Sequence, residues 1–255
     1  MTRVGVLGAA GRMGLSIARV ATEEGVKIVA AVDRNRPGDD FGEAAGIGRL
    51  DVPISSDLAV LQDVEVVVDF SLPDAADALF RECKVPIVTG TTGLSAEATQ
   101  ARDDAATRIP VVAAPNYSQG VTVLFHLAAE AARLLGEGFD AEVVEMHHRR
   151  KVDAPSGTAV RLAECVAEVR GLTPVHGRSG QVGARPASEI GVLALRGGDV
   201  VGEHTLFLAG LGERLELTHR ATDRHLFARG ALRAARWIGG RSPGLYDMSD
   251  VMGLR

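Results

Sequence analysis

The sequence contains few of the residues that stabilise a fold covalently or recognise nucleic-acid bases by stacking. Only two of its 255 residues are cysteine, and only 4% are aromatic. Cys83 and Cys165 lie far apart in the chain and form no CxxC spacing, which argues against a zinc site and against a disulfide framework. We expect two buried thiols in a reducing compartment.

Excess positive charge and long apolar runs are also missing. The formal net charge is −5, whereas general nucleic-acid binding needs a basic surface that neutralises phosphates. No apolar run approaches the length that crosses a membrane, and the N-terminal residues lack the apolar stretch of a signal peptide. We therefore expect a cytoplasmic protein that has neither a membrane nor a nucleic acid as its partner.

Glycine and short apolar runs, in contrast, are abundant: the chain has 30 glycines and 46% hydrophobic residues. In the first half, Val- and Ile-rich runs alternate with helical patterns, which is typical of a parallel sheet covered by helices on both faces. Residues 34–64 are less regular and are expected to be mostly loop. Strands are predicted at residues 3–8, 27–33, 65–70, 85–90 and 109–114, and helices at 14–24, 73–83 and 95–107.

After Asn116 the pattern changes. Three predicted strands follow one another in quick succession, which indicates a mixed or antiparallel sheet and hence a second, α+β domain. Residues 171–188 are expected to be loop. Helices are predicted at 120–135, 157–170 and 224–238, and strands at 141–148, 189–195, 201–209 and 214–220.

The first predicted strand leads into a glycine-rich turn, VGVLGAAGRMG, which places Gly8, Gly11 and Gly14 ahead of a helix. Such a turn lets the backbone approach a pyrophosphate, and the N–H groups at the helix start bind the phosphates. Asp33 ends the next strand, where a carboxylate accepts hydrogen bonds from the ribose of NAD, and the adjacent Arg34 suits the 2′-phosphate of NADP. We therefore expect a nicotinamide cofactor, with use of both forms as a hypothesis; a surface ion pair is the alternative for these two residues.

Two further turns follow predicted strands of the same sheet. GTTG occupies residues 90–93, and APNYS occupies residues 114–118. The carboxyl ends of the strands in an open parallel sheet line the ligand crevice. Both turns are therefore expected to converge with the glycine-rich turn on one nucleotide site.

The segment EMHHRRKVDAPSGTA, residues 145–159, has four interpretations. A solvated charged run is the usual fate of such residues. A metal site is disfavoured because adjacent histidines on a strand point to opposite faces, and nucleic acid is disfavoured by the scarcity of aromatic residues. Because the segment ends an apolar strand and precedes a turn that opens a helix, we favour a site for an anionic substrate with a proton donor.

The residues of this segment fit such a site. His147 and His148 lie at the predicted strand end, where an imidazole serves as a general acid near neutral pH, and Lys151 adds a positive charge. Gly157 and Thr158 begin the following helix, whose N–H groups suit a carboxylate. The substrate implied is small and carries carboxylates, and no metal is expected.

Together, several motifs resemble those of the 4-hydroxy-tetrahydrodipicolinate reductase family, also called the dihydrodipicolinate reductases. The resemblance extends from the first predicted strand to the C-terminal tail. It implies reduction of 4-hydroxy-tetrahydrodipicolinate to tetrahydrodipicolinate, with loss of water, by NADH or NADPH in lysine and diaminopimelate biosynthesis. It also implies a homotetramer. The motifs are GAAGRMG, DFSLP, GTTG, APNYSQGV, EMHHRRKVDAPSGTA, RGGDVVGEHT and GLYDM.

The resemblance implies roles for individual residues of the substrate site. His147 matches the proton donor and acceptor of the family, and Lys151 matches its second proton donor. His148, Gly157 and Thr158 match substrate-binding positions. Arg149 and Arg150 have no role in this scheme and are expected to take little part in the chemistry.

The resemblance also implies the cofactor contacts. Asp33 stands where several family members have glutamate, and Pro115 and Tyr117 stand where others have alanine and phenylalanine. These departures bear on cofactor preference rather than on the reaction. The matching positions are Gly8, Ala9, Ala10, Gly11, Arg12, Met13, Asp33, Arg34, Gly90, Thr91, Thr92, Ala114, Pro115, Asn116 and Tyr117.

The predicted fold class is α/β, a Rossmann-type doubly wound parallel sheet with a second α+β domain built on a mixed sheet. The predicted domains are 1–117 for dinucleotide binding, 118–223 for substrate binding and oligomerisation, and 224–255 as a C-terminal helix and tail that return to the first domain. A cofactor on one domain and a substrate on the other imply hinge closure.

Other interpretations stay open at this stage. The chain could be a related two-domain NAD(P)-dependent amino-acid dehydrogenase, or a nucleotide-sensing protein without catalysis. In RGGDVVGEHT, strand alternation separates the charged side chains, and residues 197–199 are predicted to form a hairpin turn, so a structural or subunit-contact role is favoured over catalysis. Asp153 either orients the basic cluster or forms an Asx turn.

Overall fold

The structure is a computed structural model that describes residues 2–255. The chain divides into two compact units. The first unit runs as far as Gln119 and resumes with His225–Arg255, and the second unit is Gly120–Arg224. These divisions fall close to the predicted domain boundaries. The assignment of dinucleotide binding to one unit and of substrate binding to the other stays a prediction.

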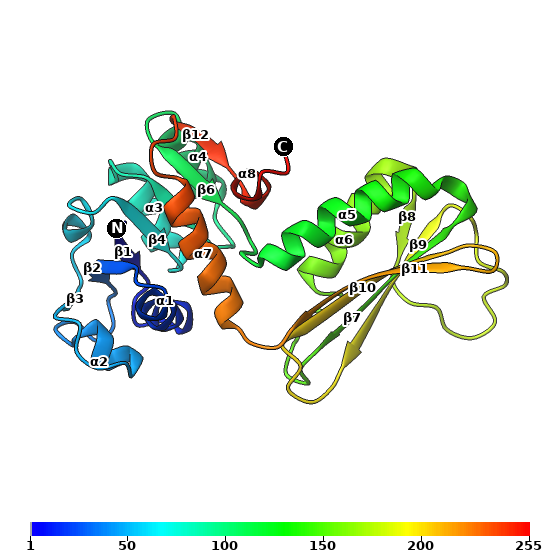
Figure 1. The fold of residues 1–255 in the computed structure, drawn as a ribbon, viewed down its shortest axis with the longest axis horizontal. Helices are drawn as coiled ribbons and strands as arrows, with labels where there is room; N and C mark the ends of the chain where they lie inside the picture. The colour runs from blue at the N-terminus through cyan, green and yellow to red at the C-terminus, as the bar shows by residue number, and fades with distance from the viewer. Residues whose placement is uncertain (1) are drawn as a thin grey trace. The chain divides into compact units, whose positions relative to one another are not determined.

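The first unit is built on a seven-stranded sheet with the order β12-β6-β5-β4-β1-β2-β3 (Figure 1). Every neighbouring pair is parallel, which confirms the predicted sheet. Two strands were not predicted, β3 and β12, because two or three residues are too short to show a period. The strands are Arg3–Leu7 (β1), Lys27–Val32 (β2), Ile54–Ser55 (β3), Val66–Asp69 (β4), Ile87–Thr89 (β5), Pro110–Ala113 (β6) and Gly244–Tyr246 (β12).

Helices cover both faces of this sheet, which explains why its strands read as continuous apolar runs. In β4, Val66 and Val68 join a core cluster shared with α1 and α7, whereas Val67 joins a second cluster shared with α3 and α4. The stretch predicted as mostly loop also contains a short helix and a single 3₁₀ turn. The helices are Arg12–Glu23 (α1), Phe41–Ala45 (α2), Leu58–Leu61 (η1), Pro73–Glu82 (α3), Ala96–Ala106 (α4), His225–Trp237 (α7) and Met248–Met252 (α8).

Helix α7 ties the C-terminal part of the chain to the first unit. Leu232 is fully buried in the core cluster that contains α1, and Trp237 packs against the same cluster. Gly230 permits the close approach of the helix, because a Cβ atom there would lie 1.7 Å from the carbonyl oxygen of Tyr117. On the outer side, Arg229 forms ion pairs with Glu23 and Glu24 at the end of α1.

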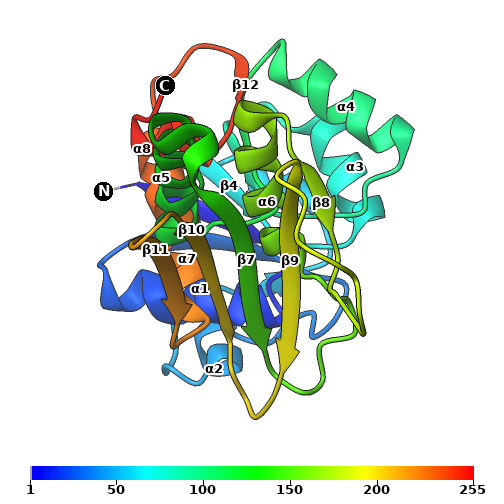
Figure 2. The ribbon, with the colours of Figure 1, turned by 90° about the vertical axis from the view of Figure 1, so that its right-hand side faces the viewer.

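The second unit is built on a five-stranded sheet with the order β11-β10-β7-β9-β8, which Figure 2 shows in sequence across the sheet. The sheet is mixed, as predicted: β7 pairs in parallel with β9 and antiparallel with β10. Strand β8 falls in a stretch predicted as loop. The elements are Gln119–Leu135 (α5), Gly136–Gly138 (η2), Asp140–His147 (β7), Gly157–Arg170 (α6), Thr173–Val175 (β8), Glu189–Arg196 (β9), Gly202–Ala209 (β10) and Arg214–Ala221 (β11).

The predicted hairpin turn at residues 197–199 is wrong. Strands β9 and β10 are not neighbours, because β7 lies between them. The connection instead passes over the end of β7, where Gly197 N–H donates to the carbonyl of His147, and Gly198 has a φ of 52°. This crossing brings Arg196 opposite His147 in the register of β7 and β9.

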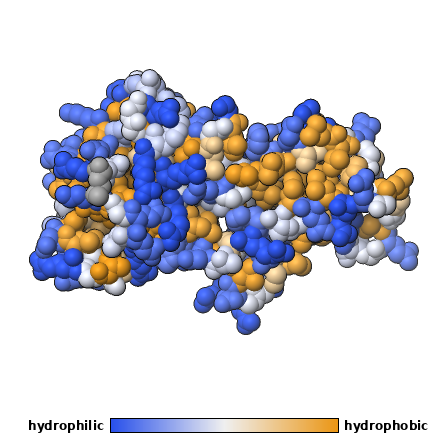
Figure 3. All heavy atoms as spheres, in the orientation of Figure 1, coloured by the Kyte–Doolittle hydropathy of each residue, from blue (hydrophilic) through white to orange (hydrophobic). Residues whose placement is uncertain are grey.

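The two faces of the second sheet differ in their cover. Val143, Val192 and Leu206 face α5 and α6 and form the core of the unit. On the opposite face of β9, Leu193 and Leu195 are 36% and 51% exposed. Helix α5 is also apolar on its outer side, where exposed leucines lie within the hydrophobic surface that Figure 3 shows over this helix.

Candidate active site

The glycine-rich turn between β1 and α1 leaves no room for side chains. Gly8 has a φ of 82°, a conformation that L residues rarely adopt, and a Cβ atom there would lie 2.5 Å from the carbonyl oxygen of Phe70. A Cβ atom on Gly14 would lie 2.3 Å from the carbonyl oxygen of Gly8. The turn therefore packs strand against helix closely and presents the start of α1 as a bare backbone surface, as a dinucleotide site requires.

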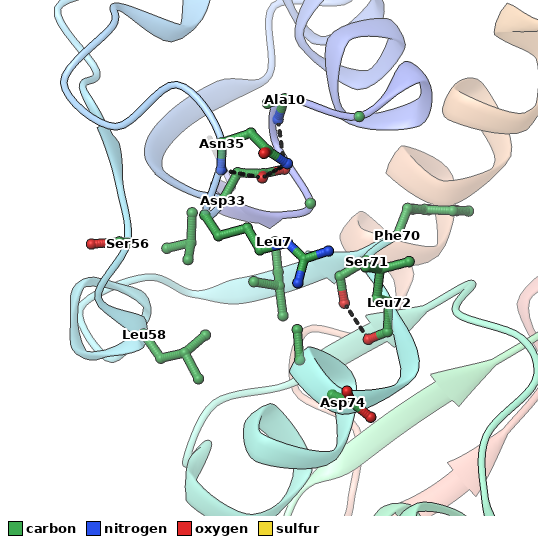
Figure 4. A pocket seen from close by; sticks show the side chains of 15 residues that line it. Leu7, Ala10, Asp33, Asn35, Ser56, Leu58, Phe70, Ser71, Leu72 and Asp74 are labelled. Atoms are coloured by element: carbon green, nitrogen blue, oxygen red, sulfur yellow. Dashed lines mark hydrogen bonds between the residues drawn. The ribbon is translucent and has the colours of Figure 1, made fainter.

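A cavity of about 460 Å³ lies beside this turn and is lined by Gly8, Gly11, Asp33, Arg34 and Ser71 among others. Figure 4 shows Asp33 turned toward Ala10 and Asn35 on one side of the cavity, with Ser71 and Leu72 on the other. The cavity lies at the carboxyl ends of β1, β2 and β4, which is where the ligand crevice of an open parallel sheet lies.

Asp33 connects the end of β2 to the glycine-rich turn. Its Oδ2 accepts a hydrogen bond from the N–H of Ala10 at 3.0 Å, and its Oδ1 accepts one from the N–H of Asn35 at 2.8 Å. A carboxylate offers about four acceptor sites, so these bonds leave capacity for a hydroxyl of a ligand. Arg34 is exposed and lines the same cavity.

Asp69, at the end of β4, holds two turns of the sheet edge together. Its carboxylate is fully buried and accepts hydrogen bonds from the hydroxyls of Thr89 and Thr91, at 2.7 and 2.9 Å, and from the N–H of Ser71 at 3.0 Å. Burial raises the pKa of Asp69 above its ordinary value, although these hydrogen bonds oppose the shift. Asp69 was not predicted as a site residue. An acid at the end of an otherwise apolar strand is the sequence feature that could have indicated it.

A second cavity, of about 330 Å³, lies at the carboxyl ends of β5 and β6. Four of the predicted cofactor contacts line it, namely Thr91, Thr92, Ala114 and Pro115. Tyr117 does not, because its side chain is 1% exposed and lies in the core, where its hydroxyl donates to the carbonyl of Thr89 at 2.7 Å. Tyr117 lines neither cavity, and its role as a cofactor contact stays a prediction.

The other predicted cofactor positions lie around these two cavities. Ala9 is fully buried beneath the glycine-rich turn, whereas Arg12 is exposed at the start of α1 and Met13 packs partly against the core. Gly90 leaves room for the ring of Phe70, whose Cε1 would lie 2.2 Å from a Cβ atom. Asn116 accepts a hydrogen bond from the N–H of Ser118 at 2.8 Å and so shapes the turn after β6.

In the second unit, the predicted proton donor His147 is anchored by a carboxylate. Glu145, two residues earlier on the same face of β7, is fully buried, and its Oε2 lies 2.6 Å from Nδ1 of His147. Arg196, at the end of β9, donates to both oxygens of Glu145 at 2.8 Å. The N–H of Ser156 donates to Oε1 at 3.0 Å.

The charges of this cluster affect one another. Burial alone would raise the pKa of Glu145, but hydrogen bonds from Arg196, His147 and Ser156 lower it below its ordinary value, so Glu145 is ionised near neutral pH. Burial lowers the pKa of His147, and Lys151 and Arg196 lower it further, while Glu145 opposes the shift. The lowered pKa favours the neutral imidazole and makes the imidazolium more acidic.

Helix α6 begins beside this cluster. Ser156 is its N-cap and accepts a hydrogen bond from the N–H of Ala159 at 3.2 Å, so the helix start has the preferred capping geometry. The hydroxyl of Ser156 also lies 3.1 Å from Nε2 of His204, a buried residue of β10. The predicted substrate contacts Gly157 and Thr158 form the first turn of α6, where helical N–H groups lack carbonyl partners within the helix.

The basic residues after β7 separate into two groups. Lys151 has a side chain only 19% exposed and forms an ion pair with Asp153 at 2.8 Å, and its N–H donates to the carbonyl of His148. Arg149 and Arg150 are exposed. The ion pair agrees with an orienting role of Asp153 on the cluster. His148 is half-buried, and its Nδ1 is buried without a hydrogen-bond partner among the described residues.

Within residues 2–255, no group of three or more His, Cys, Asp and Glu side chains is arranged to hold a metal ion. No helix in the same range is long and apolar enough to span a membrane.

A parallel α/β unit with a glycine turn, an acid at the end of β2 and a cavity between them defines a dinucleotide-binding protein. The second unit adds a partly buried histidine paired with a buried glutamate beside a helix N-terminus. The two together define a two-domain nicotinamide-dependent oxidoreductase.

Comparisons with known proteins identify the family. The family model for the dihydrodipicolinate reductase N-terminus matches residues 2–117, and the model for the C-terminus matches residues 120–252. The chain therefore belongs to the dihydrodipicolinate reductase family. These matches confirm the predicted family and the predicted enzyme class, an NAD(P)H-dependent oxidoreductase.

Individual relatives agree with the family models. The chain is 52% identical over 265 residues to the 4-hydroxy-tetrahydrodipicolinate reductase of Anaeromyxobacter sp. (strain Fw109-5), covering 100% of this chain and 99% of the relative. It is 50% identical over 267 residues to that of Alkalilimnicola ehrlichii, covering 99% of both. The structure is similar to a dipicolinate-bound dihydrodipicolinate reductase from Paenisporosarcina sp. TG-14, with a TM-score of 0.76, 26% identity and 97% coverage of each chain.

Proposed function

We propose that the chain catalyses the NAD(P)H-dependent reduction of 4-hydroxy-tetrahydrodipicolinate to tetrahydrodipicolinate, with loss of water, in lysine and diaminopimelate biosynthesis. Family membership supports the reaction. The observation on this chain that carries the proposal is the pairing of partly buried His147 with fully buried Glu145 beside the N-terminus of α6, because it combines a candidate proton donor with a helix start that suits a carboxylate.

The residues of the first unit fit a dinucleotide. Gly8 and Gly14 let the turn, β1 and α1 pack closely against neighbouring backbone, and the N–H groups at the start of α1 suit a pyrophosphate. Asp33 has acceptor capacity for a ribose hydroxyl, and Arg34 can meet a 2′-phosphate. We therefore propose that the chain uses both NADH and NADPH, either of which supplies the hydride when it is bound.

The residues of the second unit fit a small dicarboxylate. The first turn of α6 offers N–H groups to one carboxylate, whereas Lys151 offers positive charge and His148 offers its ring nitrogens to the other. The dipicolinate bound to the similar enzyme of Paenisporosarcina sp. TG-14 is a ligand of this kind. Gly157 is exposed, so a ligand has access to this helix start.

Reduction of the conjugated imine requires a proton as well as a hydride. Nδ1 of His147 faces Glu145, so Nε2 is the nitrogen that can exchange a proton with the substrate. Burial lowers the pKa of His147, which makes its imidazolium a better acid. The ammonium of Lys151 is held by Asp153 and is the second proton donor in this scheme.

We also propose that the chain forms a homotetramer through the sheet of the second unit. The face of this sheet that is turned away from α5 and α6 carries Leu193 and Leu195, both partly exposed. Exposed apolar side chains on a sheet face are typical of a subunit interface. Light scattering on the purified protein tests the proposal, which requires the mass of four 26.7 kDa chains.

One assay tests the reaction. Oxidation of NADH and of NADPH is followed with substrate generated in place from pyruvate and aspartate semialdehyde. The wild-type chain should oxidise both cofactors, whereas His147→Gln and Lys151→Met should lower kcat by about 10²- to 10⁴-fold, the usual contribution of a general acid, and still bind cofactor. Arg150→Met removes a nearby exposed cation and is the matched control, with turnover expected to persist.

The alternatives give different results in the same assay. Cofactor binding without oxidation in the wild-type chain would favour a nucleotide-sensing protein and refute the reductase proposal. Oxidation of NADH that forms an amino acid from a 2-oxo acid and ammonia, with no reduction of the dihydropyridine, would favour an amino-acid dehydrogenase. Near-wild-type turnover by either His147→Gln or Lys151→Met would show that its assigned role is wrong.

A further inference from the structure

We propose that Glu145 is the positioning residue of this site. Its single buried carboxylate fixes both the imidazole of His147 and the start of α6, and Arg196 holds the carboxylate in place. The inference rests on the proposed function, because it concerns how the proposed proton donor and the proposed carboxylate-binding helix are held in fixed positions relative to each other.

The hydrogen bonds of Glu145 divide evenly between its two oxygens. Oε2 lies 2.6 Å from Nδ1 of His147 and 2.8 Å from Nη1 of Arg196. Oε1 accepts from the N–H of Ser156 at 3.0 Å and from Nη2 of Arg196 at 2.8 Å. Arg196 and the backbone of Ser156 can only donate hydrogen bonds, so both oxygens of Glu145 must accept them. An ionised carboxylate has two such oxygens and carries no proton of its own.

This arrangement selects one form of the imidazole. With Oε2 accepting from Nδ1, neutral His147 carries its proton on Nδ1 and keeps its lone pair on Nε2. The ring cannot rotate freely, because Gly202 lies against Nε2, where a Cβ atom would come within 2.9 Å, and His204 packs edge-on at a centroid distance of 5.1 Å. The nitrogen that faces the substrate is thus fixed in both direction and protonation.

Titratable groups face His147 from four places. Glu145 lies on its own strand, Arg196 on β9, His204 on β10, and Lys151 in the segment before α6. Burial lowers the pKa of His204 to about 4, so His204 is neutral near neutral pH. Of these four groups, Glu145 is the one that carries negative charge and the one that stabilises an imidazolium at His147.

Glu145 also links His147 to the carboxylate-binding helix. Ser156 contributes its N–H to Glu145 and its side chain to the cap of α6, so the carboxylate fixes where the first turn of the helix begins. A change at Glu145 should therefore affect substrate binding and proton transfer together, whereas a loss of packing alone would affect only stability.

The chain offers a matched control on the same strand. Glu142 also pairs with guanidinium groups, accepting from Arg178 at 2.9 and 3.0 Å and from Arg185 at 2.7 Å. It lies an odd number of residues from Glu145 and therefore on the opposite face of the sheet. Glu142→Gln removes a comparable ion pair from β7 without a contact to His147.

The test compares three variants with the wild-type chain. Glu145→Gln should lower kcat by about 10²-fold or more, as expected when a general acid loses its orientation, and raise the KM for the substrate. Its pH profile should shift as well: the imidazolium is lost at lower pH once the negative charge is gone, so kcat should begin to fall at lower pH than in the wild type. Glu145→Asp keeps the charge and should return the fall toward the wild-type pH, and Glu142→Gln should leave the profile unchanged.

A second readout does not depend on turnover. With histidines labelled at the ring nitrogens, NMR reports the neutral tautomer of each ring, and His147→Gln identifies the signal of His147. The wild type should show the Nδ1–H form, and Glu145→Gln should lose this preference. An unchanged tautomer and an unchanged pH profile in Glu145→Gln would overturn the inference. Failure of the wild type to turn over the substrate would instead refute the proposed function, and the tautomer result would still stand.

Discussion

The hydroxyl of Tyr117 provides a sharp test of how the first unit is held together. Tyr117→Phe removes one oxygen and keeps the ring. The structure places this oxygen in the core, where it donates to the carbonyl of Thr89 at 2.7 Å, with the carbonyl of Val112 at 3.2 Å. The hydroxyl thus joins the ends of β5 and β6.

The expected loss follows from these contacts. A buried hydrogen bond contributes about 0.5–1.5 kcal/mol net, and a buried carbonyl left without a partner costs about 1–3 kcal/mol. The carbonyl of Thr89 also accepts from the N–H of Ala114 at 3.2 Å, so the variant does not leave it without a partner. We expect Tyr117→Phe to lower the free energy of unfolding of the first unit by about 1 kcal/mol. Burial raises the pKa of Tyr117 well above its ordinary value, so the loss should be the same at all pH values between about 5 and 9.

Urea and thermal denaturation measure this loss. For a unit of this size, about 1 kcal/mol corresponds to a fall in Tm of about 2–4 °C. The two units need not unfold together, and the transition of the first unit is the one that added NADH shifts. Tyr246→Phe is the matched control, because that hydroxyl donates to the carbonyl of Ser242 at the surface and its loss should change little. No loss in Tyr117→Phe, a loss above about 3 kcal/mol, or a loss that varies with pH would refute the reasoning.

Two further predictions concern Asp69 and the subunit interface. Because burial raises the folded-state pKa of Asp69 above 3.8, the wild type should lose stability as pH rises from about 4 through that raised pKa. Asp69→Asn stays neutral and can still accept a hydrogen bond from the N–H of Ser71, so the Tm of this variant measured against pH should lack the decline. A Tm of Asp69→Asn that falls toward neutral pH as steeply as that of the wild type would contradict the prediction. Leu195→Lys should lower the mass found by light scattering, because it places a charge on the open face of the second sheet, whereas Val60→Lys in the first unit should not. An unchanged mass in Leu195→Lys would count against an interface through this sheet.

The sequence predicted the first unit well because its signals are local. Continuous Val and Ile runs, such as Val66–Asp69, record burial on both faces, and the glycines between β1 and α1 record a backbone that cannot carry side chains. Strands of two or three residues, such as Ile54–Ser55, leave no periodic pattern and were not predicted. Such short strands are defined by their pairing with a neighbouring strand and not by the pattern of their own residues.

The cluster around His147 contains residues that local sequence patterns do not predict. Glu145 was within reach of prediction, because an acid two residues before a histidine on a strand lies on the same face. Arg196 and His204 were not, because the predicted hairpin turn made β9 and β10 neighbours with no strand between them. The structure inserts β7 between them, so Arg196 approaches Glu145 from one side and His204 lies opposite it from the other. Strand order depends on which pairing buries the most apolar surface across the whole sheet. The candidate proton donor and its carboxylate partner could therefore be found from the strand pattern, but Arg196 and His204 could be found only from the topology.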